Sequence, residues 1–286
     1  MTERDDSSSR IATSTLSDDA SPYILMQRID TQRWNPSNLL PEHKRPFDGL
    51  YHNFLMELES SVRHETICEQ YLEQMESEYR ELKPYLPDQV SSILDIGCGM
   101  AGIDLFLWDH YRDQQPEVTL FDKSEVSDEL YYRFYDDAAF YNSLDTARQN
   151  LVNNNIPGDR INTVQATPEN LRELDGIDFC LSLYSWGFHY PVKTYLDEVR
   201  DALSPNGRVV LDIRKETGEV TKDTEGYRAC ENAFETVEEI KDEHKYRRII
   251  LSGPIRTDST SPEQSREDTV ASSSAPDKEP ATAGVV

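Results

Sequence analysis

The glycine-rich segment 97–102 carries the clearest chemical signal in this sequence. It reads Gly-Cys-Gly-Met-Ala-Gly, which fits the spacing G-x-G-x-x-G, and the acidic residue Asp122 follows about 20 residues later. Glycines let a backbone pass close to a ligand, a following helix offers free N–H groups, and an acid can bind ribose hydroxyls. The segment therefore predicts a nucleoside-bearing cofactor. The alternative is a tight strand-to-helix turn that binds no ligand.

Asp95 narrows the choice of cofactor. It lies two residues before the first glycine, inside the otherwise apolar segment 92–96. An added carboxylate at this point would repel the diphosphate of a dinucleotide, whereas it would attract an ammonium group. S-adenosylmethionine carries an ammonium and a sulfonium group and no phosphate, so the residues favour it over NAD.

The segment 93–102 strongly resembles motif I of the class I S-adenosylmethionine-dependent methyltransferases. The resemblance extends over about residues 90–252. Asp122 matches the acid that binds the ribose in that family. The segment 203–208 is similar to the family's Leu-x-Pro-Gly-Gly turn into the fifth strand, with Asn206 in place of one glycine.

A second point of resemblance lies after the third expected strand, where the family binds adenine. Ala166 matches the small residue of that segment, and Gln165 stands where the family often has an aspartate. The resemblance implies S-adenosylmethionine as the cofactor. The residues expected to bind it are Asp95, Gly97, Cys98, Gly99, Asp122, Gln165, Ala166 and Ser182.

An aromatic segment, 182–191, follows the fourth expected strand. Trp186, Phe188 and Tyr190 could form a wall against the sulfonium or a platform for the acceptor, so Trp186 and Tyr190 are candidate substrate-binding residues. His189 is the candidate general base, because its ordinary pKa lies near neutrality. The alternatives are that the aromatic rings only pack the segment onto the sheet and that His189 caps a helix.

Apolar periodicity predicts the elements that hold these residues. Three- and four-residue spacing predicts a helix over 51–86, which Pro84 and Pro87 stop. Strands are expected at 92–96, 118–121, 161–164, 179–183 and 208–213, with helices between them. This alternation is typical of a doubly wound α/β fold with a parallel sheet.

The last two expected strands, 234–240 and 246–251, are joined by a short polar turn and should pair antiparallel. The predicted fold is therefore an α/β, mostly parallel seven-stranded sheet with an antiparallel C-terminal hairpin and an N-terminal helical cap. The expected boundaries are a disordered tail at 1–20, the helical cap at 21–88, the methyltransferase domain at 89–253, and a disordered acidic tail at 254–286.

The insertion 123–141 is rich in tyrosine and phenylalanine. Such a loop must bury its rings against something. It could close over the acceptor as a lid, shape the acceptor pocket together with residues 21–86, or only add packing.

Charge and composition restrict the function classes. The chain has 54 acidic and 29 basic residues and a formal net charge of −25, so it should repel a phosphate backbone and a basic membrane-surface role is disfavoured. The acidity fits either salt adaptation or an ordinary acidic protein. No apolar run approaches the roughly 18 residues needed to span a bilayer, and no N-terminal secretory signal is visible. The four cysteines are widely spaced, and no metal site is expected. A soluble cytoplasmic protein with no nucleic-acid or membrane partner is predicted.

The predicted function is methyl transfer from S-adenosylmethionine to a small-molecule acceptor, for example a hydroxyl of a sugar or a related metabolite. Two alternatives stay open. One is a protein that binds S-adenosylmethionine without catalysis. The other, which rests only on the glycine spacing, is an NAD-dependent oxidoreductase.

Overall fold

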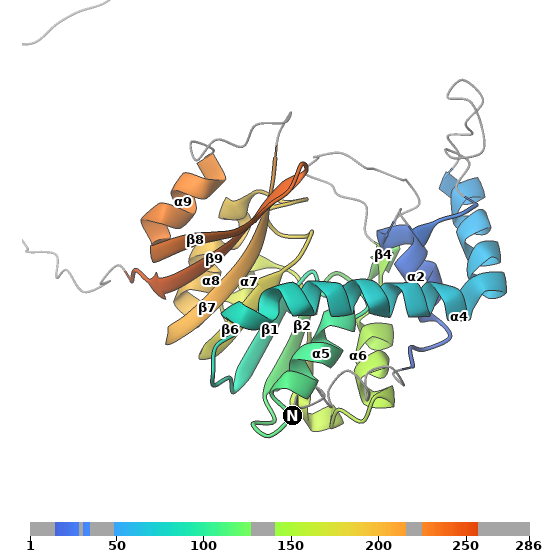
Figure 1. Cartoon of the computed structure of the whole chain (residues 1–286), viewed down its shortest axis with the longest axis horizontal. Coiled ribbons are helices and arrows are strands. Elements are labelled where there is room, and N and C mark those ends of the chain that lie inside the picture. The colour runs from blue at the N-terminus through green and yellow to red at the C-terminus, as the bar shows by residue number, and fades with distance from the viewer. Residues whose placement is uncertain (1–14, 29–30, 35–48, 127–140, 216–224, 257–286) are drawn as a thin grey trace, which may run out of the picture. The chain divides into compact units, whose positions relative to one another are not determined.

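The computed structural model describes residues 15–28, 31–34, 49–126, 141–215 and 225–256. Its main feature is a seven-stranded sheet (Figure 1). Across the sheet the strands are β5 (Ile161–Gln165), β2 (Glu117–Asp122), β1 (Ser92–Ile96), β6 (Ile177–Ser182), β7 (Leu203–Arg214), β9 (Tyr246–Pro254) and β8 (Phe234–Asp242). The strands from β5 to β7 pair in parallel, whereas β9 pairs antiparallel with both β7 and β8. The predicted mostly parallel sheet with an antiparallel C-terminal hairpin is confirmed.

The chain reverses its direction of travel across the sheet at β1. It moves outward through β2 and β5 and then returns to place β6 on the other side of β1. At such a switch point the carboxyl ends of the strands leave room for a ligand. The glycine-rich segment 97–102, called the glycine loop below, follows β1, and residues 182–191 follow β6. The fold therefore brings the two predicted functional segments to one edge of the sheet.

Helices cover both faces of this sheet (Figure 1). One face carries α2 (Ala20–Gln27), α4 (Gly49–Leu82), α5 (Gly102–His110) and α6 (Leu144–Asn153), and the other carries α7 (Pro168–Leu171), α8 (Leu196–Ala202) and α9 (Glu225–Ala233). Successive strand residues alternate between the two cores: on β1, Ile93 packs with α4 and α5, and Leu94 packs with α8 and α9.

Short elements complete the connections. Three 3-10 turns lie at Lys83–Tyr85, Gly158–Arg160 and Val192–Thr194. The strands β3 (Glu125–Val126) and β4 (Tyr141–Asn142) form a small antiparallel ladder. Most of the predicted aromatic insertion, residues 127–140, lies outside the described residues, as does the C-terminal segment 257–286.

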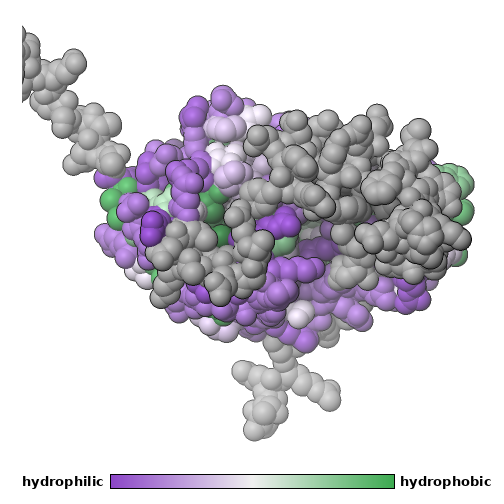
Figure 2. Space-filling model, turned by 90° about the horizontal axis from the view of Figure 1, so that it is seen from above, coloured by the Kyte–Doolittle hydropathy of each residue, from purple (hydrophilic) through white to green (hydrophobic). Residues whose placement is uncertain are grey.

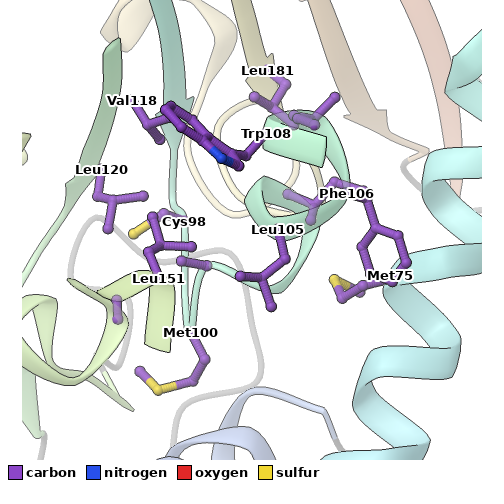
Figure 3. Close-up of a cluster of buried hydrophobic side chains, with 14 of the residues drawn as sticks. Met75, Cys98, Met100, Leu105, Phe106, Trp108, Val118, Leu120, Leu151 and Leu181 are labelled. Atoms are coloured by element: carbon purple, nitrogen blue, oxygen red, sulfur yellow. The ribbon is translucent and has the colours of Figure 1, made fainter. Parts of the chain in front are cut away.

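The core on the α4 face closes around the glycine loop. Cys98 and Met100 of the loop lie in one buried cluster with Phe106 and Trp108 of α5 and with Met75 of α4 (Figure 3). Each large apolar side chain buried in this way contributes about 1.5–3 kcal/mol. The packing thus fixes the loop between β1, α5 and α4.

The N-terminal half of α4 differs from the simplest expectation. The helix itself is confirmed, but Phe54, Leu58 and Val62, which are spaced as a buried stripe, are 58%, 43% and 65% exposed. The side chains that are buried instead are those of Met56, Glu59 and Ser60. Glu59 accepts hydrogen bonds from the backbone N–H groups of residues 33–34 (2.8 and 2.9 Å). These charge-assisted bonds hold the Glu59 side of the helix against the preceding chain.

The expected N-terminal tail also differs where it is described. Leu16 and Ala20 are buried, and the backbone N–H groups at 15 and 17 donate to the side chains of Asn154 and Asn150. Residues 15–20 therefore pack against α6 and do not form part of a solvated tail.

The described residues contain no helix that combines the length and apolar character needed to cross a membrane. The described surface visible in Figure 2 is mainly hydrophilic, in keeping with the net charge of −25. All four cysteines are buried and unbonded to one another.

Candidate functional site

The glycine loop has a backbone that requires small residues. Gly97 and Gly99 have positive φ angles of 77° and 53°, and Ala101, which precedes α5, also has a positive φ of 58°. A Cβ atom on Gly97 would lie 2.0 Å from the Oγ of Ser185, and one on Gly99 would lie 2.7 Å from the Oε1 of Gln27. The loop is therefore enclosed by the segment after β6 and by the end of α2.

Asp122 ends β2 directly beside this loop. Its Oδ2 accepts a hydrogen bond from the backbone N–H of Gly99 at 3.0 Å, and its Oδ1 accepts one from the N–H of Lys123 at 2.7 Å. Burial raises the pKa of Asp122 to about 6, and the two backbone donors partly oppose this shift. Asp122 thus lies where the resemblance expects a ribose-binding acid.

Two amide side chains that the sequence did not indicate complete this side of the site. Gln27 donates a 3.4 Å hydrogen bond to the Oδ1 of Asn142. Asn142 is buried, and its side chain lies against the Asp122 carboxyl and the Cys98 thiol. Burial, followed by the charges of nearby carboxylates, raises the pKa of Cys98, so the thiol stays protonated. Cys98 is therefore no nucleophile here.

Asp95 and Asp104 form a pair of buried carboxyl groups at the start of α5. Asp95 is 3% exposed and Asp104 is fully buried, and the two side chains lie within hydrogen-bonding reach of each other. Burial raises the pKa of both groups, and the neighbouring charges of Asp104 and then Asp122 raise that of Asp95 further. Neither oxygen of Asp104 accepts a hydrogen bond from an N–H or O–H group of any other described residue.

The residues expected near adenine lie at the end of β5. Ala166 is half-buried, and its N–H donates to the carbonyl of Asp122 at 3.0 Å, which continues the β2–β5 pairing. Gln165 is exposed, and its Oε1 accepts a 3.3 Å hydrogen bond from the N–H of Ser124. Both residues lie beside Asp122 at the same edge of the sheet as the glycine loop.

Ser182 and Trp186 are fully buried among other residues of the protein. The Ser182 hydroxyl donates to the carbonyl of Ile96 (2.8 Å) and accepts from the N–H of Trp186 (2.9 Å). Trp186 is fully buried, and its indole N–H donates to the carbonyl of Val192 at 2.8 Å. Tyr190 is half-buried. Ser182 and Trp186 therefore hold the loop after β6 against the end of β1.

His189 lies in the exposed part of that loop. Its ring meets the Phe188 ring edge to face, with 5.0 Å between the centroids, and the backbone N–H of His189 donates to the carbonyl of Ser185 at 2.7 Å. Desolvation by neighbouring atoms, with the positive charge of Arg214, lowers the pKa of His189 to about 4. The imidazole is neutral at physiological pH and is a weak base.

A closed network of charges and hydroxyls lies further along the same edge. Arg248 of β9 pairs through two nitrogens with Asp212 of β7 (2.7 and 2.9 Å) and through a third with Glu78 of α4 (2.5 Å). Tyr184, which follows β6, donates to Glu78 at 3.1 Å and shares a 2.9 Å hydrogen bond with the Tyr246 hydroxyl. The φ of Tyr184 is 58°, a strained value for an aromatic residue. These contacts hold Tyr184 in that conformation.

The helix α4 also contacts the start of α5. The Tyr71 hydroxyl accepts a 3.1 Å hydrogen bond from the N–H of Gly102, and a Cβ on Gly102 would lie 2.5 Å from the Tyr71 ring. Arg28, just after α2, lies with its guanidinium 5.2 Å from the centroid of the Tyr184 ring. Tyr71 and Arg28 thus line the side of the site that faces α4.

The fold therefore brings together the glycine loop, Asp95, Asp122 and the end of β5, as expected, and adds residues that the sequence did not indicate. The additions are Gln27, Arg28, Tyr71, Glu78, Asp104, Asn142, Tyr184, Asp212, Tyr246 and Arg248. One signal was available: Asp212 and Arg248, like Asp95, interrupt apolar strands. Within the described part of the chain, no three His, Cys, Asp or Glu side chains gather as metal ligands would.

One family model and several solved structures match this chain. A family model described as a methyltransferase domain matches residues 71–249. No curated protein matches the chain. Three similar solved structures are a precorrin-6y C5,15-methyltransferase from Geobacter metallireducens GS-15, a methyltransferase from Pyrococcus furiosus, and the S-adenosylmethionine-dependent methyltransferase SibL in its apo form.

These similarities are distant. The Geobacter protein is 17% identical over 63% of this chain and 87% of its own, with a TM-score of 0.42. The Pyrococcus protein is 22% identical over 63% and 83%, also with a TM-score of 0.42. SibL is 16% identical over 82% and 70%, with a TM-score of 0.45. The matched family model spans more than half of the chain and includes the whole glycine loop. The chain therefore belongs to the methyltransferase-domain family and has the seven-stranded fold of the class I S-adenosylmethionine-dependent methyltransferases.

Proposed function

We propose that this protein transfers a methyl group from S-adenosylmethionine to a small-molecule acceptor. The supporting observation is the buried pair Asp95 and Asp104, which lies beside a glycine loop and forms no ion pair with a described lysine or arginine. Buried carboxyl groups attract a cation and repel a diphosphate. The ammonium and sulfonium groups of S-adenosylmethionine meet that requirement, and the diphosphate of NAD does not.

The surrounding residues fit the same cofactor. Asp122 would bind the ribose hydroxyls, Asp95 would face the ammonium group, and Gly97 and Gly99 would let the backbone approach it. Residues 165–166 would lie toward the adenine. The cofactor, when bound, supplies an electrophilic methyl group on its sulfonium. The chain's own contribution is to align the two reactants and to exclude water, effects that can supply about 7–11 kcal/mol of the barrier.

We assign the acceptor to the side of the site formed by residues 184–190. The half-buried rings of Tyr184, Phe188 and Tyr190 offer apolar faces, which suit the ring of a sugar or of a related metabolite that carries the acceptor hydroxyl. Trp186 is left out of this assignment, because its side chain is fully buried. A net charge of −25 disfavours a nucleic-acid acceptor, and a cytoplasmic location stays a prediction.

We do not assign His189 as the general base. A catalytic base works best when its pKa lies near the working pH, and the pKa of His189 is lowered to about 4. The high pKa of Tyr184, raised by burial and then by Glu78, makes its hydroxyl a donor and no base. A neutral amine acceptor would need no base.

Two other functions would use the same fold. A protein that only binds S-adenosylmethionine would contain the same cofactor residues, so turnover alone separates it from an enzyme. An NAD-dependent oxidoreductase would need the glycine loop to accept a diphosphate beside Asp95 and Asp104, which the charges oppose.

Thermal-shift measurements with S-adenosylhomocysteine and with NAD would test the cofactor. A ligand at 100 times its dissociation constant stabilises the folded protein by about 2.7 kcal/mol. Stabilisation by S-adenosylhomocysteine alone is expected, and stabilisation by NAD alone would refute the proposal. Incubation with methyl-labelled S-adenosylmethionine and a metabolite extract, followed by mass spectrometry, should reveal a product that has gained one methyl group. A binding protein without catalysis would give none.

A further inference from the structure

Asp104 is a charged side chain whose partner is missing from the described protein. It is fully buried, and no described N–H or O–H group outside its own residue donates a hydrogen bond to either carboxylate oxygen. A buried carboxyl group without donors is costly, so such groups normally pair or take up a proton. The side chain within its reach is another carboxyl group, that of Asp95.

Local geometry places the two groups together. Asp95 is on β1, on the same face as Ile93, which packs with α4 and α5. Asp104 belongs to the first turn of α5, which begins directly after the positive-φ residue Ala101. The short loop between strand and helix therefore brings two carboxyl groups to one point beside the positive-φ glycines.

The groups that face this pair come from each neighbouring element. Asp122 faces it from β2, the Cys98 thiol from the glycine loop, and the Cys180 thiol from β6. From α4 it is faced by the Tyr71 hydroxyl, which also interacts with the guanidinium of Arg28 just after α2. The surroundings of the pair are thus anionic or neutral, and Arg28 is engaged elsewhere, over the ring of Tyr184.

We propose that Asp104 and Asp95 together bind the ammonium group of the cofactor, that they share one proton in the free protein, and that this proton is released when the cofactor binds. The proposal rests on S-adenosylmethionine as the cofactor. Two carboxyl groups in contact and out of water cannot both be ionised without a cation. An ammonium group that arrives between them replaces the proton, which passes to the solvent, and charge is conserved.

The proposal predicts a pH dependence with a definite sign. Because the free pair holds a proton that the complex lacks, affinity for an ammonium-bearing ligand should rise with pH. For one released proton the limit is about tenfold per pH unit, reached while the pair is protonated. S-adenosylhomocysteine carries the ammonium group, whereas methylthioadenosine has the same nucleoside and thioether without it.

Isothermal titration calorimetry on the unmodified protein provides the test. Each ligand is titrated between pH 6 and 8, at every pH in two buffers with different heats of ionisation. The expected result is net release of close to one proton with S-adenosylhomocysteine at the lower pH and clearly less with methylthioadenosine. Methylthioadenosine would also bind at Asp122 through its ribose. The proton release measured with methylthioadenosine therefore serves as the baseline for the ribose end of the site. Equal proton release by both ligands would overturn the inference and leave the proposed function intact. No binding of S-adenosylhomocysteine at any pH would instead remove the proposed function.

Variants test whether the released proton comes from the pair that contains Asp104. Asp104→Asn should bind S-adenosylhomocysteine about tenfold or more weakly at pH 8, because a charge-assisted contact is lost, and should lose most of the pH dependence. Its affinity for methylthioadenosine should stay the same. The matched control is Asp145→Asn, an exposed aspartate in the first turn of α6, which should change neither ligand. Asp104→Asn with the proton release and affinity of the unmodified protein would assign the proton elsewhere and refute the proposal.

Discussion

Two clusters of charged side chains lie on the face of the sheet that α4 covers. They differ in whether each charge has a partner of opposite sign. In the first, Arg248 pairs with Asp212 and Glu78, so a fully buried cation meets two anions. In the second, Asp95 and Asp104 lie together without a described lysine or arginine to pair with. The first group joins β7, β9 and α4, and the second joins β1 and α5.

This difference distinguishes a charge cluster that stabilises the fold from one that binds a ligand. A charge cluster that satisfies itself needs nothing from outside, so its removal should damage the fold. An incomplete cluster lowers the stability of the free protein and is retained where a ligand completes it. The network around Arg248 should therefore carry stability, and the carboxyl groups at the glycine loop should carry binding.

The largest expected effect is that of Arg248→Met. Removing the guanidinium leaves the buried Asp212 and the half-buried Glu78 without their cation, which should lower the free energy of unfolding by about 3–5 kcal/mol. Urea denaturation followed by circular dichroism measures this. Arg80→Met, which breaks an exposed pair with Glu76 on the same helix α4, is the control and should cost about 1 kcal/mol or less. Equal losses in the two variants would mean that the buried network carries no special stability.

Asp122→Ala should have the next largest effect, on binding and not on folding. Loss of charge-assisted hydrogen bonds, each about 1.5–3 kcal/mol, should weaken S-adenosylhomocysteine by roughly 10–100-fold. The circular dichroism spectrum should not change. Calorimetry measures the affinity, and the exposed Asp159→Ala is the control. An unchanged dissociation constant in the folded variant would contradict the ribose assignment.

Asp104→Asn should change the stability of the ligand-free protein less than Arg248→Met does. Its main effect should be to make that stability less dependent on pH. The raised pKa values of Asp95 and Asp104 mean that the folded state holds protons that the unfolded chain has lost. Stability should therefore fall as pH rises through those raised values. The variant should lose less stability than the unmodified protein between pH 5 and 8, by roughly 1–3 kcal/mol, since the raised pKa of Asp104, about 7, lies two units above pH 5 and one unit equals 1.36 kcal/mol.

Urea denaturation at several pH values checks this prediction. Destabilisation by Asp104→Asn as large as that by Arg248→Met would show that both clusters are structural, and the distinction between them would then fail.

His189→Gln should have the smallest effect. Since the pKa of His189 is lowered to about 4, the ring is neutral from pH 6 to 9, and turnover should change by less than about tenfold with the same pH profile. The lowered pKa also means that the unmodified protein loses stability as pH falls from about 6.5 toward 4, a loss that the variant should not share. A 10²-fold fall in rate, together with the disappearance of an ionisation near neutral pH, would instead make His189 the base.

Local patterns in the sequence were sufficient for the fold and for half of the site. Strand and helix periods, the glycine loop and the short turn before β9 act between residues close in the chain, so they predicted the seven strands and their parallel and antiparallel arrangement. Asp95 was recognisable because a carboxyl group interrupts an apolar strand. Asp122 was recognisable from its distance to the glycines.

Tertiary structure alone decided which charges are satisfied and which are not. Arg248 and Glu78 are 170 residues apart, and only the crossing of α4 over β9 joins them. Asp104 reads as an ordinary first-turn helix acid until its burial against Asp95 is known. Trp186 read equally well as ligand contact or core until its full burial placed it in the core. Residue type and spacing determine which chemistry is available, but burial and partners depend on contacts between distant segments, and those decide the charge that a side chain carries.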